Sequence, residues 1–570
     1  MIRKLSLLLA LLMLLTLACA CAGTPEDSGA GSPSANPPAG GTSDGGGGDG
    51  GGDIDTDEGW TGDYEDYIPP AADVSAELTI MMWAGDGSYM QDIGHKDYAP
   101  EDLTGQNQAA AYAVAKEFNK LYPNVKINIF AKQDDPDSDD MLWAQHIENF
   151  RAEYGKYPDF YAATDIPGDI KKGMCADISI FENDPVYRSF NKSVLELANY
   201  GGRQFALPQF MQPWGVYVNK TLAESNNIDI PGPNWTIDEY TSFVSHSSPA
   251  DWWYGAMDCP LDFLRTGSKG FAYSLTTRGD GDPYVNLATE EFYKLMEYVS
   301  KWSGHAVWPQ NDLGNTPEGF MDEYWWWSYR FFQQGRLLTL DGDPWMMGDQ
   351  ANPDPESFYY VSWDWDIYPR PSTAELGNTV GVVFDPFAIH NYYADPGVSE
   401  EDAYAKLQIA YEFAKFWCAD TRAWKARAEQ MWTDQGAIKT ALNDSLPMVV
   451  GKAFDEQMEI FYSTATHQRF ADKAKMPGFQ KVLELWENGD IWDVSDKAYP
   501  WRYESEGSVR EILFEYLNSW DPDVNGGARR TDANWIDNIK ARMPDWNREF
   551  NERWVNEFKA IDDALNKYYK

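Results

Sequence analysis

The first 75 residues constrain the fold of this chain most, because their composition keeps them out of a packed core. Arg3 and Lys4 precede the apolar run Leu5–Leu17. A charged start followed by an apolar run of this length is typical of an export signal, whereas a helix that spans a membrane needs roughly 18 or more apolar residues. We therefore expect residues 1–21 to be a removable leader and the rest of the chain to work outside the cytoplasm.

Two cysteines follow the apolar run. Cys19 and Cys21 lie among small residues, and this arrangement resembles a bacterial lipobox, in which the thiol receives a diacylglycerol and becomes the mature N-terminus. Thr16 and Ala18 stand three positions before the two cysteines, where a lipobox usually has Leu. The resemblance implies a lipid anchor on either Cys19 or Cys21, and the alternative is an ordinary cleaved signal.

Residues 22–75 are dominated by Gly, Ser, Pro and Asp, with an almost unbroken glycine run at Gly45–Gly52. Such a segment holds too few apolar residues to offset the entropy lost on ordering. It predicts a disordered tether, whose ~50 residues have an end-to-end distance on the order of 40 Å. The folded body then extends over residues 76–570.

Charge and aromatic content narrow the class of ligand. The chain has 46 basic and 90 acidic residues, a net charge of −44, which repels nucleic acid and anionic lipid headgroups and favours a neutral or cationic ligand. It also has 25 Trp. Indole faces stack on the apolar faces of sugar rings, so this content indicates carbohydrate, although we expect most Trp residues to pack in the core.

The remaining cysteines and the known motifs offer little chemistry. Cys175, Cys259 and Cys418 are odd in number and widely spaced, which favours buried thiols over disulfides or a metal site. The predicted folded body lacks HExxH, GxSxG and Walker motifs, so nothing in it supports metalloprotease, serine hydrolase or nucleotide-driven activity. We expect no cofactor.

Hydrophobic periodicity predicts alternating strands and helices at the start of the body. The predicted strands are Leu78–Trp83, Val125–Phe130 and Asp159–Ala163, and the predicted helices are Gln108–Leu121 and Met141–Tyr154. This alternation indicates βαβ units around a parallel sheet, whose ligand sites lie beyond the carboxyl ends of the strands. Trp83, Asp86 and Asp165 fall in those loops.

Several segments carry a family resemblance in their sequence order. They are Pro158–Thr164, Gly202–Pro208, Gly215–Lys220, Pro233–Glu239, Phe332–Trp345 and Ala403–Phe416. Together they resemble the corresponding motifs of extracellular solute-binding protein family 1, the maltose-binding type that serves ABC sugar importers.

The resemblance implies an α/β fold with two lobes, as in periplasmic binding proteins, each lobe a central, mostly parallel sheet flanked by helices. Hinge crossings would lie near Pro208–Pro213 and Val380–Ala388. Lobe 1 would comprise residues 76–208 and 386–440. Lobe 2 would comprise residues 213–381 with the C-terminal helices, which the sequence predicts at Ser508–Trp520 and Ala533–Tyr568.

The candidate ligand-binding residues are aromatic or acidic and lie in the loops and crossings of this map: Trp83, Asp86, Asp165, Trp214, Trp345, Asp385 and Trp501. Carboxylates accept hydrogen bonds from sugar hydroxyls and Trp rings stack on sugars. The alternatives are helix capping for Asp86 and Asp165, hinge structure for Asp385 and a role on the lobe surface for Trp83.

A weak calcium motif occurs near the C-terminus. Asp521, Asp523, Asn525 and Asp532 have the spacing of an EF-hand loop. Position 12 is Asp instead of the bidentate Glu, and Pro522 is unusual in such a loop. A turn between helices is the favoured interpretation, and we expect no metal.

The resemblance implies a non-enzymatic, monomeric receptor tethered to the membrane through its lipid. It would capture a carbohydrate, an oligosaccharide on the strength of the surplus aromatic residues, and deliver it to the permease subunits of an ABC transporter. A secreted glycoside hydrolase and a carbohydrate-binding surface protein without a transport role remain the alternatives, and a peptide or another polar solute is an open alternative for the ligand.

Overall fold

The computed structural model describes residues 67–83, 89–132, 143–257, 329–342, 347–353, 355, 360–373, 377–434, 437–493 and 535–569, with short pieces between 274 and 307. The leader, most of the tether and the lipidation candidates Cys19 and Cys21 lie outside these residues. Among the helices described, none has both the length and the apolar character needed to cross a bilayer.

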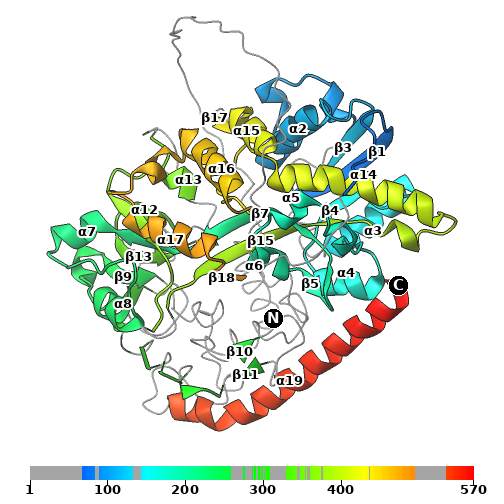
Figure 1. The fold of residues 1–570 in the computed structure, drawn as a ribbon. Helices are drawn as coiled ribbons and strands as arrows, with labels where there is room; N and C mark the ends of the chain where they lie inside the picture. The colour runs from blue at the N-terminus through cyan, green and yellow to red at the C-terminus, as the bar shows by residue number, and fades with distance from the viewer. Residues whose placement is uncertain are drawn as a thin grey trace, which may run out of the picture.

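A seven-stranded sheet forms the first body of the molecule (Figure 1). Its strands are β1 (Ala76–Trp83), β2 (Tyr89–Met90), β3 (Val125–Lys132), β4 (Phe160–Ala162), β7 (Leu207–Trp214), β15 (Val380–Ile389) and β18 (Ile491–Asp493). They are ordered β18-β15-β4-β1-β3-β2, and β7 also pairs with β15. The centre β3-β1-β4 is parallel, as the sequence predicts, whereas β15 runs antiparallel to β4.

Helices flank this sheet. They are α2 (Gln106–Phe118), α3 (Trp143–Tyr154), α4 (Ile166–Lys172), α5 (Pro185–Arg188), α6 (Lys192–Glu196), α14 (Glu400–Ala419) and α15 (Thr421–Glu429). Helix α2 buries a face rich in alanine, including Ala109–Ala111 and Ala115, and small side chains allow close packing. The helices predicted over 108–121 and 141–154 are confirmed within a few residues, and the segment Ala403–Phe416 of the family resemblance lies within α14.

A five-stranded sheet forms the second body, to the left in Figure 1. Its strands are β8 (Val216–Asn219), β9 (Tyr254–Met257), β12 (Ala306–Val307), β13 (Leu337–Asp341) and β14 (Trp365–Tyr368), ordered β12-β9-β13-β8-β14. Helices α7 (Lys220–Ser225), α8 (Ile237–Val244), α12 (Tyr329–Gln333) and α13 (Met347–Gln350) accompany it. Thr236 and Glu239 form a capping box that fixes the start of α8.

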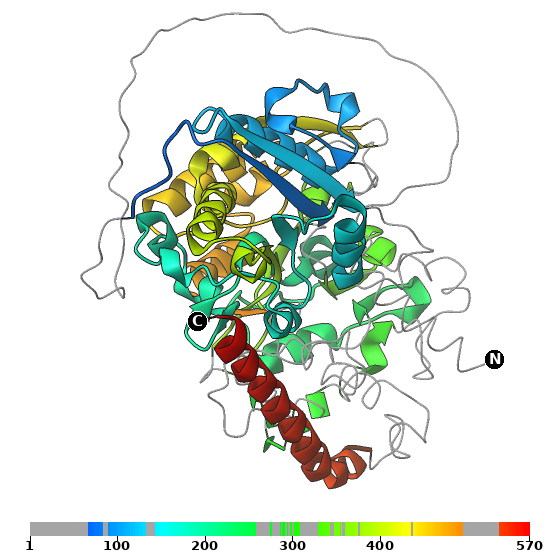
Figure 2. The same ribbon diagram turned by 90° about the vertical axis from the view of Figure 1, so that its right-hand side faces the viewer.

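Within the described residues, the other elements are three hairpins, three helices and short 3-10 turns. The hairpins are β5 (Asn199–Tyr200) with β6 (Arg203–Gln204), β10 (Ser274–Leu275) with β11 (Val285–Asn286), and β16 (Met431–Asp434) with β17 (Ala437–Thr440); the helices are α16 (Lys452–Ser463), α17 (Pro477–Glu487) and α19 (Trp535–Tyr568). The 3-10 turns are Ile93–His95, Pro100–Asp102, Ser179–Phe181, Pro249–Asp251, Ser303–His305, Tyr392–Ala394 and Gln468–Ala471. Helix α17 packs on β14, and α19 lies along the outside of the molecule (Figures 1 and 2).

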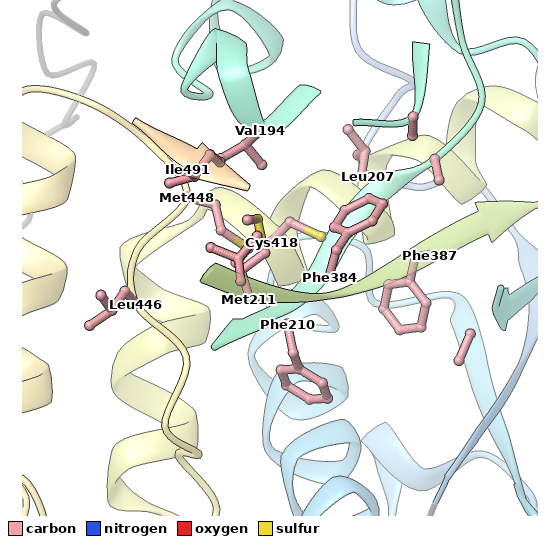
Figure 3. Packing of buried hydrophobic residues seen from close by; sticks show 14 of the residues in the cluster. Val194, Leu207, Phe210, Met211, Phe384, Phe387, Cys418, Leu446, Met448 and Ile491 are labelled. Carbon is pink, nitrogen blue, oxygen red and sulfur yellow. The ribbon is translucent and has the colours of Figure 1, made fainter. Parts of the chain in front are cut away.

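Strands β7 and β15 form the junction between the two bodies. They pair antiparallel from Leu207↔Phe387 to Gly381↔Trp214, and β7 continues through Gly215 into β8 of the second sheet. Around them packs an apolar core that includes Met211, Phe384 and Cys418 (Figure 3). Cys418 and Cys175 are buried free thiols, as expected from the sequence, and Cys259 lies outside the described residues.

Candidate functional site

The candidate site lies where the carboxyl ends of the parallel strands meet the junction strands. Trp83 is the last residue of β1 and is half-buried. Its carbonyl oxygen accepts a hydrogen bond from Asn107 Nδ2 at 2.6 Å. Because Asn107 lies in the first turn of α2, this contact fixes the end of β1 against the helix that follows it. Trp83 therefore stands at the edge of the sheet where parallel α/β sheets bind ligands.

Asp165 follows β4 and is the N-cap of α4. Its Oδ1 accepts from the backbone N–H of Gly168 at 3.0 Å. A Cβ at Gly168 would lie 2.0 Å from Asp165 Oδ2, so glycine is needed for this close approach. Of the two roles considered for Asp165, the structure shows capping; contact with a ligand stays a prediction.

Trp214 ends β7 and is buried, with 4% of its surface exposed. Its Nε1 donates to Asp341 Oδ1 at 3.1 Å, and Arg370 Nη2 donates to both oxygens of the same carboxylate at 2.9 and 3.0 Å. Arg370 is only 1% exposed. In this conformation the indole therefore ties the end of a junction strand to the second sheet, and stacking on a ligand would require its ring to become exposed.

Asp385 lies on β15 opposite Phe210 of β7 and is half-buried. The register between the two strands shifts between Asp385 and Pro386. A shift of this kind bends a strand and redirects its side chains. Asp385 thus marks an irregular point in the junction between the two bodies, which is compatible with either a hinge or a ligand role.

The other sequence candidates lie outside the described residues. They are Asp86, Trp345, Trp501 and the weak calcium set Asp521, Asp523, Asn525 and Asp532. Within the described part of the chain, no group of three or more His, Cys, Asp or Glu side chains could hold a metal ion.

The chain around Asp444 and Leu446 also lies beside the junction strands. The sequence analysis did not identify this segment. Leu446 N donates to Met211 O of β7 at 3.0 Å. Nearby, Asp444 Oδ1 accepts from Gly348 N at 3.0 Å and lies 2.7 Å from Nε2 of the buried His467. Helix α13, which begins two residues after Trp345, is therefore fixed to this segment. No local sequence pattern predicts these contacts, since the bonded groups are at least 23 residues apart in the sequence.

Comparison with solved structures identifies the class of this fold. A sugar transporter protein from Rhizobium etli, solved in an open conformation, superimposes with a TM-score of 0.51 and 16% identity over 82% of this chain and 99% of that one. An ABC substrate-binding protein from Listeria monocytogenes, solved with cycloalternan, gives 0.50 and 14% over 83% of this chain and 99% of that one. The chain has the two-lobed α/β fold of the solute-binding proteins, which confirms the predicted fold class.

The fold shared with these two structures is the fold that the resemblance in the sequence implies. No protein-family model matches the chain. The curated proteins likewise give no match.

Proposed function

We propose that this chain is the substrate-binding component of an ABC importer and that it captures a carbohydrate, with an oligosaccharide favoured, between its two lobes. The observation that carries the proposal is the junction: β7 and β15 connect two separate sheets, and the ends of β1 and β4 lie on the first of them. A ligand that contacts both bodies favours the conformation in which they are close together. The similar protein from Listeria monocytogenes was solved with a cyclic sugar.

The proposed lobes follow the two sheets. Lobe 1 comprises residues 76–208 and 386–440, and lobe 2 comprises residues 213–381. Helix α17 packs on β14 and so belongs with lobe 2, whereas α19 contacts α4 of the first body as well as β11.

The proposed ligand contacts combine stacking and hydrogen bonding. Trp345 and Trp83 would stack on sugar rings, and Asp86 and Asp385 would accept from sugar hydroxyls. Trp501 and Asp165 complete the proposed set. Trp214, held by Asp341 and Arg370, would position the crossing.

Anchoring and delivery are further parts of the proposal. A diacylglycerol on Cys19 or Cys21 would hold the protein outside the cytoplasm. The tether, predicted over residues 22–75, would be limited to residues 22–66, because Tyr67 and Ile68 already bond to α14, and it would let the folded body reach the permease. The protein would act as a monomer without catalysis. The low number of apolar residues in the tether supports a spacer that stays unfolded.

The test is calorimetry and intrinsic Trp fluorescence of the purified protein against a panel of plant and microbial oligosaccharides, with product analysis of each mixture. We expect stoichiometric binding and the sugar recovered intact. Shortened products would instead establish a glycoside hydrolase, and a panel without binding would reject the carbohydrate assignment.

Replacement of Trp345 tests the stacking residue directly. Trp345→Ala should weaken binding of the best sugar by roughly 1 to 3 kcal/mol, because a stacked indole contributes about that much. Trp252→Ala, which removes a half-buried Trp beside Arg336 outside the proposed set, is the matched control. Equal affinity of the Trp345→Ala protein and the wild type would remove Trp345 from the site.

A further inference from the structure

Helix α19 is unusual in its length and in its one-sided burial. It spans 34 residues, or about 50 Å at 1.5 Å per residue. One stripe of side chains is buried along its whole length: Ile539, Met543, Trp546, Phe550, Trp554, Phe558, Ile561 and Leu565. Their spacing of three or four residues keeps them on a single face. Figure 1 shows the helix passing the β10–β11 hairpin and ending at the C-terminus beside α4.

The C-terminal end of α19 is fixed to the first body. Just beyond the helix, Tyr569 donates its hydroxyl proton to Cys175 O at 2.8 Å, and Glu557 pairs with Lys171 of α4. The ring of Tyr568 lies where a side chain at Gly173 would stand, since a Cβ there would be 2.6 Å from it. Gly173 also has a φ of +68°. Glycine is therefore required here for two reasons, the positive φ and the close approach of the Tyr568 ring.

The N-terminal half of α19 contacts residues that lie in sequence between β9 and β12, two strands of the second sheet. Asn547 Nδ2 donates to Asn286 Oδ1 of β11 at 3.0 Å, and the ammonium group of Lys540 lies 4.8 Å from the centre of the Tyr293 ring. Tyr298, five residues after Tyr293 in the sequence, is 2% exposed. Burial, followed by a hydrogen bond with Asp238 of α8, raises its pKa. This stretch is therefore connected to the helix that packs on β9.

Between these two contact regions the helix is continuous. Arg553 pairs with Glu549 one turn earlier, and Asn551 Nδ2 donates to Asn547 O at 2.7 Å. The proline in the helix, Pro544, would weaken it by removing a backbone hydrogen bond. However, Pro544 lies beside Lys540 and Asn547, within the contact with the second body, and leaves the span from Asn547 to Glu557 uninterrupted.

We propose that α19 is a strut that holds the two lobes at a set separation. The lobes are joined at β7 and β15, with the contacts of Asp444 and Leu446 beside them, and α19 connects them again along the outside of the molecule. Rotation about the junction then requires α19 to slip at one end or to bend. This inference deepens the proposed function, because it makes closure depend on a ligand whose contacts with both lobes exceed the free energy needed to displace the helix.

The test measures the distance between the lobes without any ligand, so its result does not depend on the sugar proposal. Spin labels are placed at Lys120→Cys on the first body and Glu224→Cys on the second, both exposed positions. Cys19, Cys21 and Cys259 are replaced by serine, and the distance distribution is recorded by pulsed electron paramagnetic resonance. We expect a single narrow peak for this otherwise unaltered protein.

The strut is then weakened between its two ends. Glu552, Val555 and Asn556 are exposed on the outer face of this span, so replacing all three with glycine leaves the buried stripe intact and makes the helix much easier to bend. The matched control replaces the same three residues with alanine, which keeps the helix. We expect the glycine protein to give a distribution at least twice as broad, and the alanine protein to keep the narrow peak.

A second variant guards against loss of folding in the glycine protein. Lys540→Ala with Asn547→Ala removes polar contacts at one end of the strut and should broaden the distribution in the same direction. Circular dichroism reports whether each protein is folded. A broad distribution before any change to α19, or a narrow one kept in every folded variant, would overturn the strut. Failure of every sugar to bind would leave this test unaffected and would count only against the proposed function.

Discussion

Buried carboxylates fasten a helix to each of the two bodies, but they do so with different partners. In the first body, Lys415 of α14 contacts Asp184 Oδ2 at 2.6 Å and Glu412 Oε1 at 2.7 Å. In the second body, Asp366 of β14 accepts from Gly478 N at 2.7 Å and Phe479 N at 3.1 Å, in the first turn of α17. One carboxylate pair depends on a side-chain cation, and the other carboxylate depends on a helix N-terminus.

This difference shows that a buried carboxylate can be sensitive to the loss of a partner in one place and to pH in another. Tyr67 and Tyr122 also donate to Glu412, so the first cluster is a network of charges and hydroxyls that a change of partner disrupts. The N-cap residue of α17, Met476, has only a thioether, which is a weak hydrogen-bond acceptor. The oxygens that cap the helix therefore come from Asp366 of β14. Burial raises the pKa of Asp366 to about 6, so this contact responds to pH.

The largest expected effect comes from removing the cation of the first cluster. Lys415→Met should destabilise the protein by about 3 to 5 kcal/mol, because Asp184 and Glu412 are then buried beside each other without their cation. The free energy of unfolding is measured by urea denaturation followed by Trp fluorescence. Lys425→Met is the matched control, since Lys425 and its partner Glu429 are 65% and 69% exposed. We expect the control to change stability by less than about 0.5 kcal/mol, and equal losses in both variants would contradict the importance of the network.

The second body should instead show a pH-dependent effect. A pKa of about 6 for Asp366, above its ordinary 3.8, means that the folded state binds the proton more tightly than the unfolded state. The stabilisation is present in full below about pH 4 and is lost as the pH rises through 6, by about 3 kcal/mol in total at 1.4 kcal/mol per unit.

Asp366→Asn isolates this contribution from the other acidic residues. The stability of wild type relative to Asp366→Asn should fall by about 3 kcal/mol between pH 4 and pH 7, measured from urea midpoints at each pH. Glu429→Gln, at an exposed position, should show no such trend. If wild type gained stability over Asp366→Asn on going to pH 7, the carboxylate would be charged throughout, and the contrast between the two bodies would disappear.

The parts of the fold that sequence predicted are those with a continuous local pattern. Strands β1 and β3 and helices α2 and α3 carry their hydrophobic period within one segment, so their existence could be inferred without knowing their neighbours. The antiparallel placement of β15 beside β4 could not, because it depends on residues that are more than 200 positions apart.

In the candidate site, too, the sequence predicted local features but not contacts between distant residues. The loops after β1 and β4 were predicted because the carboxyl ends of parallel strands share an edge, and Trp83 and Asp165 lie there. The burial of Trp214 was not predicted, since its partner Asp341 lies 127 residues further along the chain. Asp341 did lie within the Phe332–Trp345 segment used for the resemblance, but nothing local pointed to a bond with Trp214.

The smallest expected effect concerns the hydroxyl that joins the start of the folded body to the first cluster. Tyr67 donates to Glu412 at 2.7 Å and lies beneath the ammonium group of Lys415, 4.6 Å from its ring centre. Tyr67→Phe keeps the ring and removes one hydrogen bond to a charged group, so we expect a loss of about 1.5 kcal/mol in urea denaturation. Tyr393→Phe, at an exposed position, should be neutral.

Combining Tyr67→Phe with Lys415→Met sharpens the comparison between the two bodies. In the Lys415→Met protein, Glu412 lacks its cation and depends more on the hydroxyl of Tyr67, so Tyr67→Phe should cost more there than in wild type. Tyr67→Phe in the Asp366→Asn protein should cost the same as in wild type, because the two clusters share no partner. A loss that is equal in all three backgrounds would mean that the tyrosine and the lysine act independently, and that the first cluster is a set of separate bonds instead of a network.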